Sequence, residues 1–443
     1  MPGLGGDWQR LHPLSPLVRA GRGLAALVVI LLIPTASGSR GTLDSLIHLG
    51  LLVVVVVLAV ITWLVTRWRV EGGVLRVESG LIRRTSERFP LSQIQAIDTV
   101  RPGLARVFGL AELRIRLASG SGKAGRLAYL SVAEAETLRT HLLALSQGLV
   151  EAPRSPPAPE QTLLTVAPAR LFASILISGT GLTLELVIVV LAVLALVAPA
   201  IAAAAFSAGT AGLLWLAITL FRRFNGEYQL TVADGPDGLR LRSGLVETSS
   251  ETIPEGRIQA LRMVEPLAWR PFGWCRLEVD VARQKSRGRQ DRNQRNASRS
   301  LLPVGSREQA AFLVTRVFQG LPDEPLAPPA RARWKSPLRF RYLSYAANER
   351  YALTTSGRLQ RVTDWVPLAK VQSIRMLEGP VQRRLRLASI HLDTAGRGVH
   401  AVLRDRDRAE AARLLDELPD RCRHSRELED RDPREPSSPA ARP

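Results

Sequence analysis

The sequence contains few of the residues from which enzymes and metal sites are built. Its 443 residues include two cysteines, Cys275 and Cys422, and six histidines. Two distant cysteines form neither a zinc knuckle nor a disulfide framework, which suits a reducing compartment. No histidine pair has ligand spacing, and no nucleophile elbow, phosphate loop or carboxylate cluster occurs in a soluble segment. The sequence therefore predicts no enzyme, no cofactor and no metal site.

Acidic residues are also scarce relative to basic ones. The chain has 60 Lys and Arg against 40 Asp and Glu, a net charge of +20, and nearly all of the positive charge is arginine. Such an excess indicates an anionic partner, either nucleic acid or a phospholipid surface. Long apolar runs without charge favour the phospholipid surface over nucleic acid.

Four apolar runs are candidates for crossing a membrane: 24–36, 46–65, 171–197 and 200–221. The second is long enough for a transmembrane helix, and the last two, separated by Pro199, predict a tight transmembrane hairpin. The first is short, and can be read either as a transmembrane helix or as a signal peptide. We expect two transmembrane hairpins, with the soluble units and both termini in the cytoplasm. This orientation follows the positive-inside rule, because arginines flank the soluble ends of the runs: Arg19, Arg22, Arg67, Arg69, Arg170, Arg222 and Arg223.

One stretch occurs three times without a gap. The copies are Gly80–Leu113, Gly244–Leu277 and Gly357–Ile390. Each has a serine before its first glycine, a proline ten residues after that glycine, and a glutamine five residues after the proline. These residues are Ser79, Ser243, Ser356, Pro90, Pro254, Pro367, Gln95, Gln259 and Gln372. The uneven spacing between copies predicts repeated domains and not solenoid turns.

Each copy lies in a segment of alternating apolar and polar residues that ends in a helix. Three capping pairs mark the helix starts: Ser131 with Glu134, Ser306 with Gln309, and Asp407 with Glu410. Strands followed by one helix predict a small antiparallel sandwich or partly open barrel with the helix over an open edge or end. The expected order is an N-terminal hairpin, domain 1, a Pro-rich linker, the second hairpin, domain 2, a Pro-rich linker, domain 3 and a disordered tail. The ranges are 1–66, 67–148, 149–169, 170–222, 223–320, 321–341, 342–420 and 421–443.

The repeated Ser-Gly, proline and [IV]-Q-[AS]-[IL] block, with the first two units directly after apolar pairs, resembles a known family. It is similar to the bacterial pleckstrin-homology-like (PH-like) membrane proteins of the YdbT/YdbS type. The resemblance implies an α+β membrane protein whose PH-like domains are seven-stranded bent sheets, each closed by a C-terminal helix. It supplies no catalytic residues and places the chain in the bacterial inner membrane. The third copy departs from the pattern, with Gly379 in place of proline and Arg386 in place of glycine.

Several residues are candidates for binding. The repeated prolines, glutamines and glycines favour a structural role. Arg106, Arg270 and Arg383 share one register and are either equivalent anion contacts or solvated arginines. A basic segment in domain 2 is either a site for anionic lipid or a solvated insertion, and its lack of aromatics argues against nucleic acid. Its basic residues are Arg283, Lys285, Arg287, Arg289, Arg292, Arg295 and Arg299.

Glu185 lies in an apolar run, where an ionisable side chain is costly and draws attention as a functional site. It is either a protonated acid hydrogen-bonded at a helix interface or part of a proton or substrate path. His48 of the second run is the one ionisable candidate to pair with it.

The sequence as a whole predicts a membrane-anchored cytoplasmic scaffold. The expected partners are the lipid bilayer, anionic lipids and a protein partner or a second copy of the chain. The alternative is a transporter or export component whose path runs between the hairpins and uses Glu185.

Overall fold

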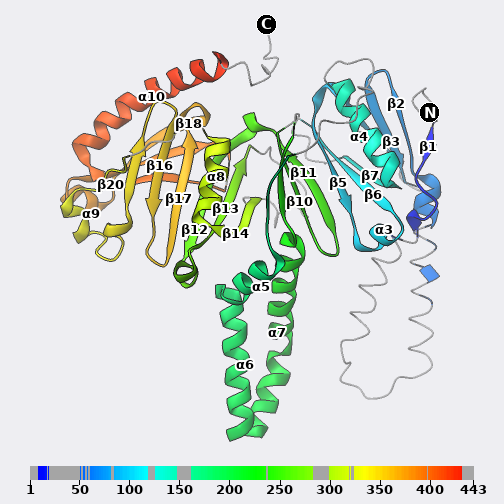
Figure 1. Cartoon of the computed structure of the whole chain (residues 1–443), viewed down its shortest axis with the longest axis horizontal. Helices are drawn as coiled ribbons and strands as arrows, with labels where there is room; N and C mark the ends of the chain where they lie inside the picture. Colours follow the sequence, from blue (N-terminus) through cyan, green and yellow to red (C-terminus); the bar gives the residue numbers. More distant parts are fainter. Residues whose placement is uncertain are drawn as a thin grey trace. The chain divides into compact units, whose positions relative to one another are not determined.

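The computed structural model describes the greater part of the chain. The described residues are 8–16, 18, 50, 53–54, 57, 60–80, 84–117, 125–146, 161–235, 238–282, 299–318, 320, 324–396 and 398–431. They form two compact units, coloured along the sequence in Figure 1. Unit 1 comprises residues 1–158 and 246–252, and unit 2 comprises residues 159–245 and 253–443.

Unit 1 contains the first domain, which is built from two antiparallel sheets and a closing helix. One sheet has the order β1-β2-β3-β4, and in the other β7-β6-β5 is extended by β11. The elements are β1 (Gln9–Arg10), β2 (Arg67–Glu71), β3 (Val74–Ser79), β4 (Thr85–Pro90), η1 (Leu91–Gln93), β5 (Ile94–Arg101), α3 (Gly103–Val107), β6 (Leu110–Leu117), β7 (Gly125–Ser131), α4 (Val132–Ser146) and β11 (Thr248–Ile253).

Unit 2 begins with the second domain. Strands β8, β9 and β10 are consecutive neighbours, and β12, β13 and β14 form a second antiparallel ladder. The elements are β8 (Gln161–Thr165), α5 (Pro168–Leu176), α6 (Gly179–Val197), α7 (Pro199–Glu227), β9 (Thr231–Gly235), β10 (Gly238–Ser243), η2 (Glu255–Arg257), β12 (Ile258–Pro266), η3 (Leu267–Phe272), β13 (Trp274–Val281), β14 (Arg299–Ser306) and α8 (Arg307–Val317).

The third domain completes unit 2. Strands β15, β16 and β17 continue the sheet of β12, and β18, β19 and β20 form a separate sheet. The elements are η5 (Ala330–Trp334), η6 (Phe340–Tyr342), β15 (Ser344–Ala347), β16 (Tyr351–Ser356), β17 (Gln360–Pro367), η7 (Leu368–Lys370), β18 (Val371–Leu377), α9 (Pro380–Arg384), β19 (Leu387–Thr394), β20 (Ala401–Asp407) and α10 (Arg408–Arg431).

The repeated residues fall at equivalent places in the three domains. In each Ser-Gly pair the serine is the last residue of a strand (β3, β10 or β16), and the glycines that follow have positive φ angles of 102°, 120° and 95°. A Cβ on Gly357 would lie 1.9 Å from the carbonyl oxygen of Gln360, so a side chain does not fit in this turn. Each repeated proline stands before a single 3₁₀ turn, so it closes one strand and leads the chain into the next sheet.

The predicted capping pairs are present in all three domains. The Ser131 and Glu134 residues exchange side-chain to backbone hydrogen bonds of 3.1 and 3.2 Å, and Ser306 and Gln309 do the same at 3.0 and 3.2 Å. Asp407 accepts from the backbone N–H groups of Ala409 and Glu410. Strands followed by a capped helix therefore form as the local sequence indicates.

The first strand of each domain is separated from the others by an insertion. In the second domain β8 pairs with β9, although α5, α6 and α7 lie between them in sequence. In the first domain β1 pairs with β2 across residues 11–66, and in the third Leu326 bridges to Tyr345 of β15. Each domain thus has a seventh edge element, as the PH-like expectation requires, and β8 lies within the range 149–169 that the sequence assigned to a linker.

The prediction of two transmembrane hairpins is wrong. Among the described residues one helix, α6, is long and apolar enough to cross a membrane. Its 19 residues span about 28 Å, close to the roughly 30 Å of a hydrocarbon core. Helix α7 runs beside α6 (Figure 1) but is rich in alanine, glycine, serine and threonine. The sequence prediction gave too much weight to the absence of charge in residues 200–221 and too little to these small side chains. The run 24–36 lies outside the described residues, and the described residues of the run 46–65 are helical.

The cores of the second and third domains are joined. Ala260 of β12 is packed within the apolar cluster of the third domain, and Trp365 of β17 within that of the second. The cause is the ladder between β12 and β17, which lie side by side in Figure 1 and run antiparallel from Leu261↔Trp365 to Pro266↔Gln360. The second and third domains therefore fold as one body and not as two independent domains.

Helix α10 continues to Arg431, so residues 421–431 are helical where the sequence predicted a disordered tail. Cys422 and Ser425 are buried on its inner face, and Arg421 pairs with Glu417 one turn earlier. Lys370 of η7 pairs with Glu429 near the helix end. These contacts supply the burial that the polar composition did not reveal.

Candidate interaction surfaces

The same short segment is exposed in each domain after the first strand of its second ladder. We call these segments the tips: tip 1 is α3 with Phe108, tip 2 is η3, and tip 3 is α9 with Leu385. Each tip exposes large apolar side chains to solvent: Leu104, Val107 and Phe108 in tip 1, Leu267 and Phe272 in tip 2, and Val381 in tip 3. Val107 is the most exposed, at 78%. Apolar side chains exposed at three equivalent places indicate contact surfaces.

The three arginines that share one register all lie in the tips. Arg106 and Arg383 are exposed, and Arg270 is half-buried. Arg270 donates to the backbone carbonyl of Arg358 at 2.6 Å and lies over the ring of Tyr342. The structure thus places the three arginines equivalently, and the contacts with Arg358 and Tyr342 hold Arg270 in place. The apolar residues beside them were not singled out in the sequence, although Phe108, Phe272 and Leu385 share a register that would have indicated them.

The basic segment connects β13 to β14. Of its seven basic residues, Arg299 is the first residue of β14 and is half-buried, and the other six lie outside the described residues. The segment thus joins two paired strands of the domain that also carries α6.

Glu185 lies nearer to one end of its helix than the sequence suggested. The helical conformation is interrupted at Ser178, and α6 begins at Gly179. The hydroxyl of Ser178 caps α6 by accepting a hydrogen bond from the N–H of Gly181. Glu185 is therefore about 9 Å from the start of the helix, on an exposed position. A transport path between two hairpins loses its basis, because among the described residues only α6 is long and apolar enough to cross a membrane.

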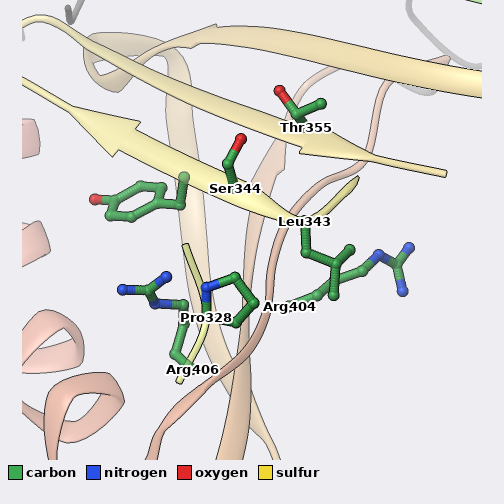
Figure 2. Close-up of a pocket in the computed structure, with 7 residues that line it drawn as sticks. Pro328, Leu343, Ser344, Thr355, Arg404 and Arg406 are labelled. Atoms are coloured by element: carbon green, nitrogen blue, oxygen red, sulfur yellow. The ribbon is translucent and has the colours of Figure 1, made fainter. Parts of the chain in front are cut away.

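A notch in the third domain, shown in Figure 2, brings hydroxyl and guanidinium groups together. It is lined by Pro328, Leu343, Ser344, Tyr345, Thr355, Arg404 and Arg406. The guanidinium groups of Arg404 and Arg406 point to opposite sides in Figure 2, and Arg406 is held by Glu410 and by the carbonyl of Ala327. Burial raises the pKa of Tyr345 to about 12, so its phenol stays protonated. The notch has no room for a water molecule and is a packing seam, not a ligand site.

A second, open groove of about 470 Å³ lies in unit 2. It brings together the repeated glutamines Gln259 and Gln372 with Lys370 and Arg426. Lys370 is already paired with Glu429 at 2.5 Å, so its charge is compensated within the protein. Gln259 donates to the carbonyl of Arg257 at 3.5 Å, which agrees with a structural role.

The contact between β12 and β17 contains the best-defined ion pair of unit 2. Arg262 donates to both carboxylate oxygens of Asp364, at 2.7 and 3.1 Å, and to the carbonyl of Gly398 at 2.9 Å. Burial works to lower the pKa of Arg262, but the hydrogen bond and charge of Asp364 outweigh it and raise that pKa. Asp280 accepts from the N–H groups of Gly398 and Val399 nearby. Side chains of the second domain thus hold both a strand and a loop of the third.

Comparison with known proteins agrees with this architecture. The family model of the bacterial PH domain matches the chain three times, at residues 20–146, 181–319 and 300–421. The chain belongs to the bacterial PH domain family. No curated protein and no solved structure matches it. The first matched range begins after β1, and the second begins within α6. Tandem PH-like domains indicate a scaffold or interaction role, and no group of metal-ligating side chains occurs among the residues with described positions.

Proposed function

We propose that this bacterial PH protein is a membrane-anchored scaffold on the cytoplasmic face of the inner membrane. Its domains hold protein partners and anionic lipid headgroups at the bilayer surface. The observation that carries the proposal is the threefold repetition of an exposed apolar tip with an arginine, on PH-like domains.

Attachment to the bilayer is supported by α6. The helix is long enough to cross a hydrocarbon core, and most of its large apolar side chains face outward from the protein. Because β8 and β9 are paired, the chain leaves the second domain before α5 and returns to the same sheet after α7. The segment from α5 to α7 therefore begins and ends at the second domain, and burial of the apolar surface of α6 in the bilayer would hold that domain at the membrane surface.

Contact with anionic lipid is supported by the composition of the tips and of the basic segment. Exposed apolar side chains next to arginine suit the boundary between headgroups and acyl chains. The segment from Arg283 to Arg299 carries seven basic residues against one acid, Asp291. Each basic residue near an anionic surface contributes about 1 kcal/mol. Anchoring raises the effective concentration of these weak contacts, so several of them add up.

The basic segment itself supplies the test, because trypsin cleaves after arginine. The full chain is placed in nanodiscs of phosphatidylcholine alone, or of phosphatidylcholine mixed with phosphatidylglycerol, and the rate of cleavage within 283–299 is measured. We expect slower cleavage in the anionic discs, and loss of this protection at high salt because surface attraction is screened. As the control for protease access, six of the seven basic residues are replaced by glutamine, and the remaining one keeps a single trypsin site in the segment. Equal cleavage rates in both discs would contradict lipid contact.

A further inference from the structure

Two of the three domains use the same strand to join a following domain. In unit 2, β12 of the second domain pairs with β17 of the third, and in unit 1, β5 of the first domain pairs with β11. The repeat copies are displaced by 164 and 113 residues, counted from Gly80 to Gly244 and from Gly244 to Gly357. By this count Ser250↔Thr99 is the same pair as Thr363↔Met263, so both junctions have the same register.

The same count identifies two strand edges without a partner. The third domain's counterpart of β5 and β12 is β18, which pairs with β19 alone among the described strands. The first domain's counterpart of β11 and β17 is β4, which pairs with β3 alone in that part of the chain. An edge strand with unpaired backbone groups is a template for another strand.

The sequence of β18 is that of a strand that joins domains. Residues 372–378, in β18 and just after it, read QSIRMLE, and residues 259–265 of β12 read QALRMVE. Both strands have a register irregularity at the same position, between residues 258 and 260 and between 371 and 373, so the irregularity does not prevent pairing. Leu261 of β12 is fully buried, whereas its counterpart in β18, Ile374, is half-buried.

The charged groups of β18 also differ from those of β12 in a way that an absent partner explains. In the occupied junction Arg262 reaches Asp364 of the next domain, and Asp280 reaches the next domain's backbone. Their counterparts are Arg375 and Asp393, which instead bind each other at 2.7 and 3.0 Å. Arg262 and Asp280 hold the next domain, whereas their counterparts Arg375 and Asp393 pair with each other.

We propose that β18 of one chain pairs with β4 of a second copy, in the register of β12 and β17, so that copies associate head to tail. This register places Arg375 opposite Glu87, and Glu378 opposite Arg84, so both pairs have opposite charges. Met376 then lies opposite Ser86. The proposal does not depend on lipid contact, because neither strand belongs to a tip or to the basic segment.

Such a contact uses two different surfaces of the chain. Because each copy presents both edges, every association leaves one β4 and one β18 at the ends of the assembly. Head-to-tail contacts of this kind form a ring if the rotation closes and an open row if it does not. A row or ring would multiply the number of tips held at one bilayer surface.

Disulfide trapping between two chains, each with one introduced cysteine, tests the contact. One full-length chain carries Ser86→Cys and a first tag, and the other carries Met376→Cys and a second tag; both are produced together in membranes and oxidised. The native cysteines do not interfere, because Cys275 and Cys422 are buried and burial raises the pKa of Cys275 to about 12. We expect a disulfide-linked pair that carries both tags. Thr85→Cys with Met376→Cys is the matched control, because adjacent strand residues point to opposite faces.

Charge exchange provides the second arm. Glu87→Arg places like charges together and should lower trapping about tenfold, whereas Glu87→Arg in one chain with Arg375→Glu in the other should restore it. A chain with both Ser86→Cys and Met376→Cys should form a ladder of linked copies. The proposal is overturned if that chain forms only a disulfide within itself, if the Thr85→Cys control traps equally well, or if charge exchange fails to restore trapping.

Discussion

Arg386 holds a backbone conformation that glycine holds in the other two domains. Its φ is 52°, against 64° for Gly109 and 65° for Gly273, and each residue follows the tip of its domain. Residues with a Cβ pay about 1–2 kcal/mol in this left-handed region. The departure of the third copy from the repeat is therefore a substitution within a conserved turn geometry, not a change of fold.

We predict that Arg386→Gly stabilises the third domain by about 0.5–1 kcal/mol, because the relief of strain exceeds the added freedom of the unfolded chain. The backbone hydrogen bonds from Arg386 to Arg383 and from Arg408 to Arg386 remain available to glycine. Thermal unfolding of the detergent-solubilised chain measures the change. Gly273→Ala is the reciprocal control and should destabilise by about 1 kcal/mol, since no atom crowds a Cβ there and only the backbone opposes it. Destabilisation by Arg386→Gly would show that the arginine side chain contributes more than its conformation costs.

A second prediction at the residue scale concerns the ion pair between the second and third domains. Asp364→Ala leaves the guanidinium of Arg262 without its bidentate partner in a setting where Asp364 is 5% exposed. Removing one partner of a buried pair costs about 3 kcal/mol. Asp420→Ala breaks the pair with Arg423, in which both side chains are largely exposed, and should change stability by less than about 0.5 kcal/mol. If the two substitutions change the unfolding midpoint to a similar extent, the Arg262–Asp364 ion pair is not a major contact between the domains.

At the scale of the elements, the tips are the surfaces expected to meet the bilayer. We predict that a fluorescent label on Val107→Cys or Phe272→Cys is quenched by spin-labelled lipid in anionic nanodiscs, because exposed apolar side chains beside arginine partition into the interface. A label on Arg423→Cys, an exposed position on α10, is the control. If the label at position 423 is quenched as strongly as the labels at the tips, the tips are not specific bilayer contacts.

Elements set by short sequence windows could be predicted, and elements set by distant pairing could not. The capping boxes at Ser131 and Ser306 depend on residues three positions apart, and they form as expected. Strand β8 was placed in a linker because its partner β9 lies beyond three helices. Helix α7 shows the limit of composition, since an uncharged run of small residues resembles a membrane segment without having the apolar surface of α6.

The candidate surfaces followed the same division. The arginines at one register were found from the repeat, and they do occupy equivalent tips. What the repeat did not reveal is which copies of a strand are paired. β12 and β18 are similar in sequence, yet one lies inside a six-stranded sheet and the other at an edge. Pairing depends on the presence of a following domain, which no local window contains.

At the scale of the whole molecule, the joined sheet changes how the domains can be separated. Deleting the third domain would expose the backbone edge of β12 and remove Trp365, which packs in the same apolar cluster as Leu261. An exposed apolar edge strand promotes aggregation. A deletion variant could then lose partner binding because it misfolds and not because a binding surface is missing. Cleavage of the chain between the two domains, which keeps both of them present, is the better experiment.

We predict that the second and third domains stay associated after the chain between them is cut. A specific protease site is inserted in residues 321–323, and the cleaved, solubilised chain is examined by size-exclusion chromatography. The fragments should elute together, because the β12–β17 ladder, the Arg262–Asp364 pair and the exchanged core residues Ala260 and Trp365 survive the cut. Adding Asp364→Ala should weaken the association, while Asp420→Ala should not. Fragments that separate in native buffer would mean that the connection in the chain, and not the shared sheet, holds these domains together.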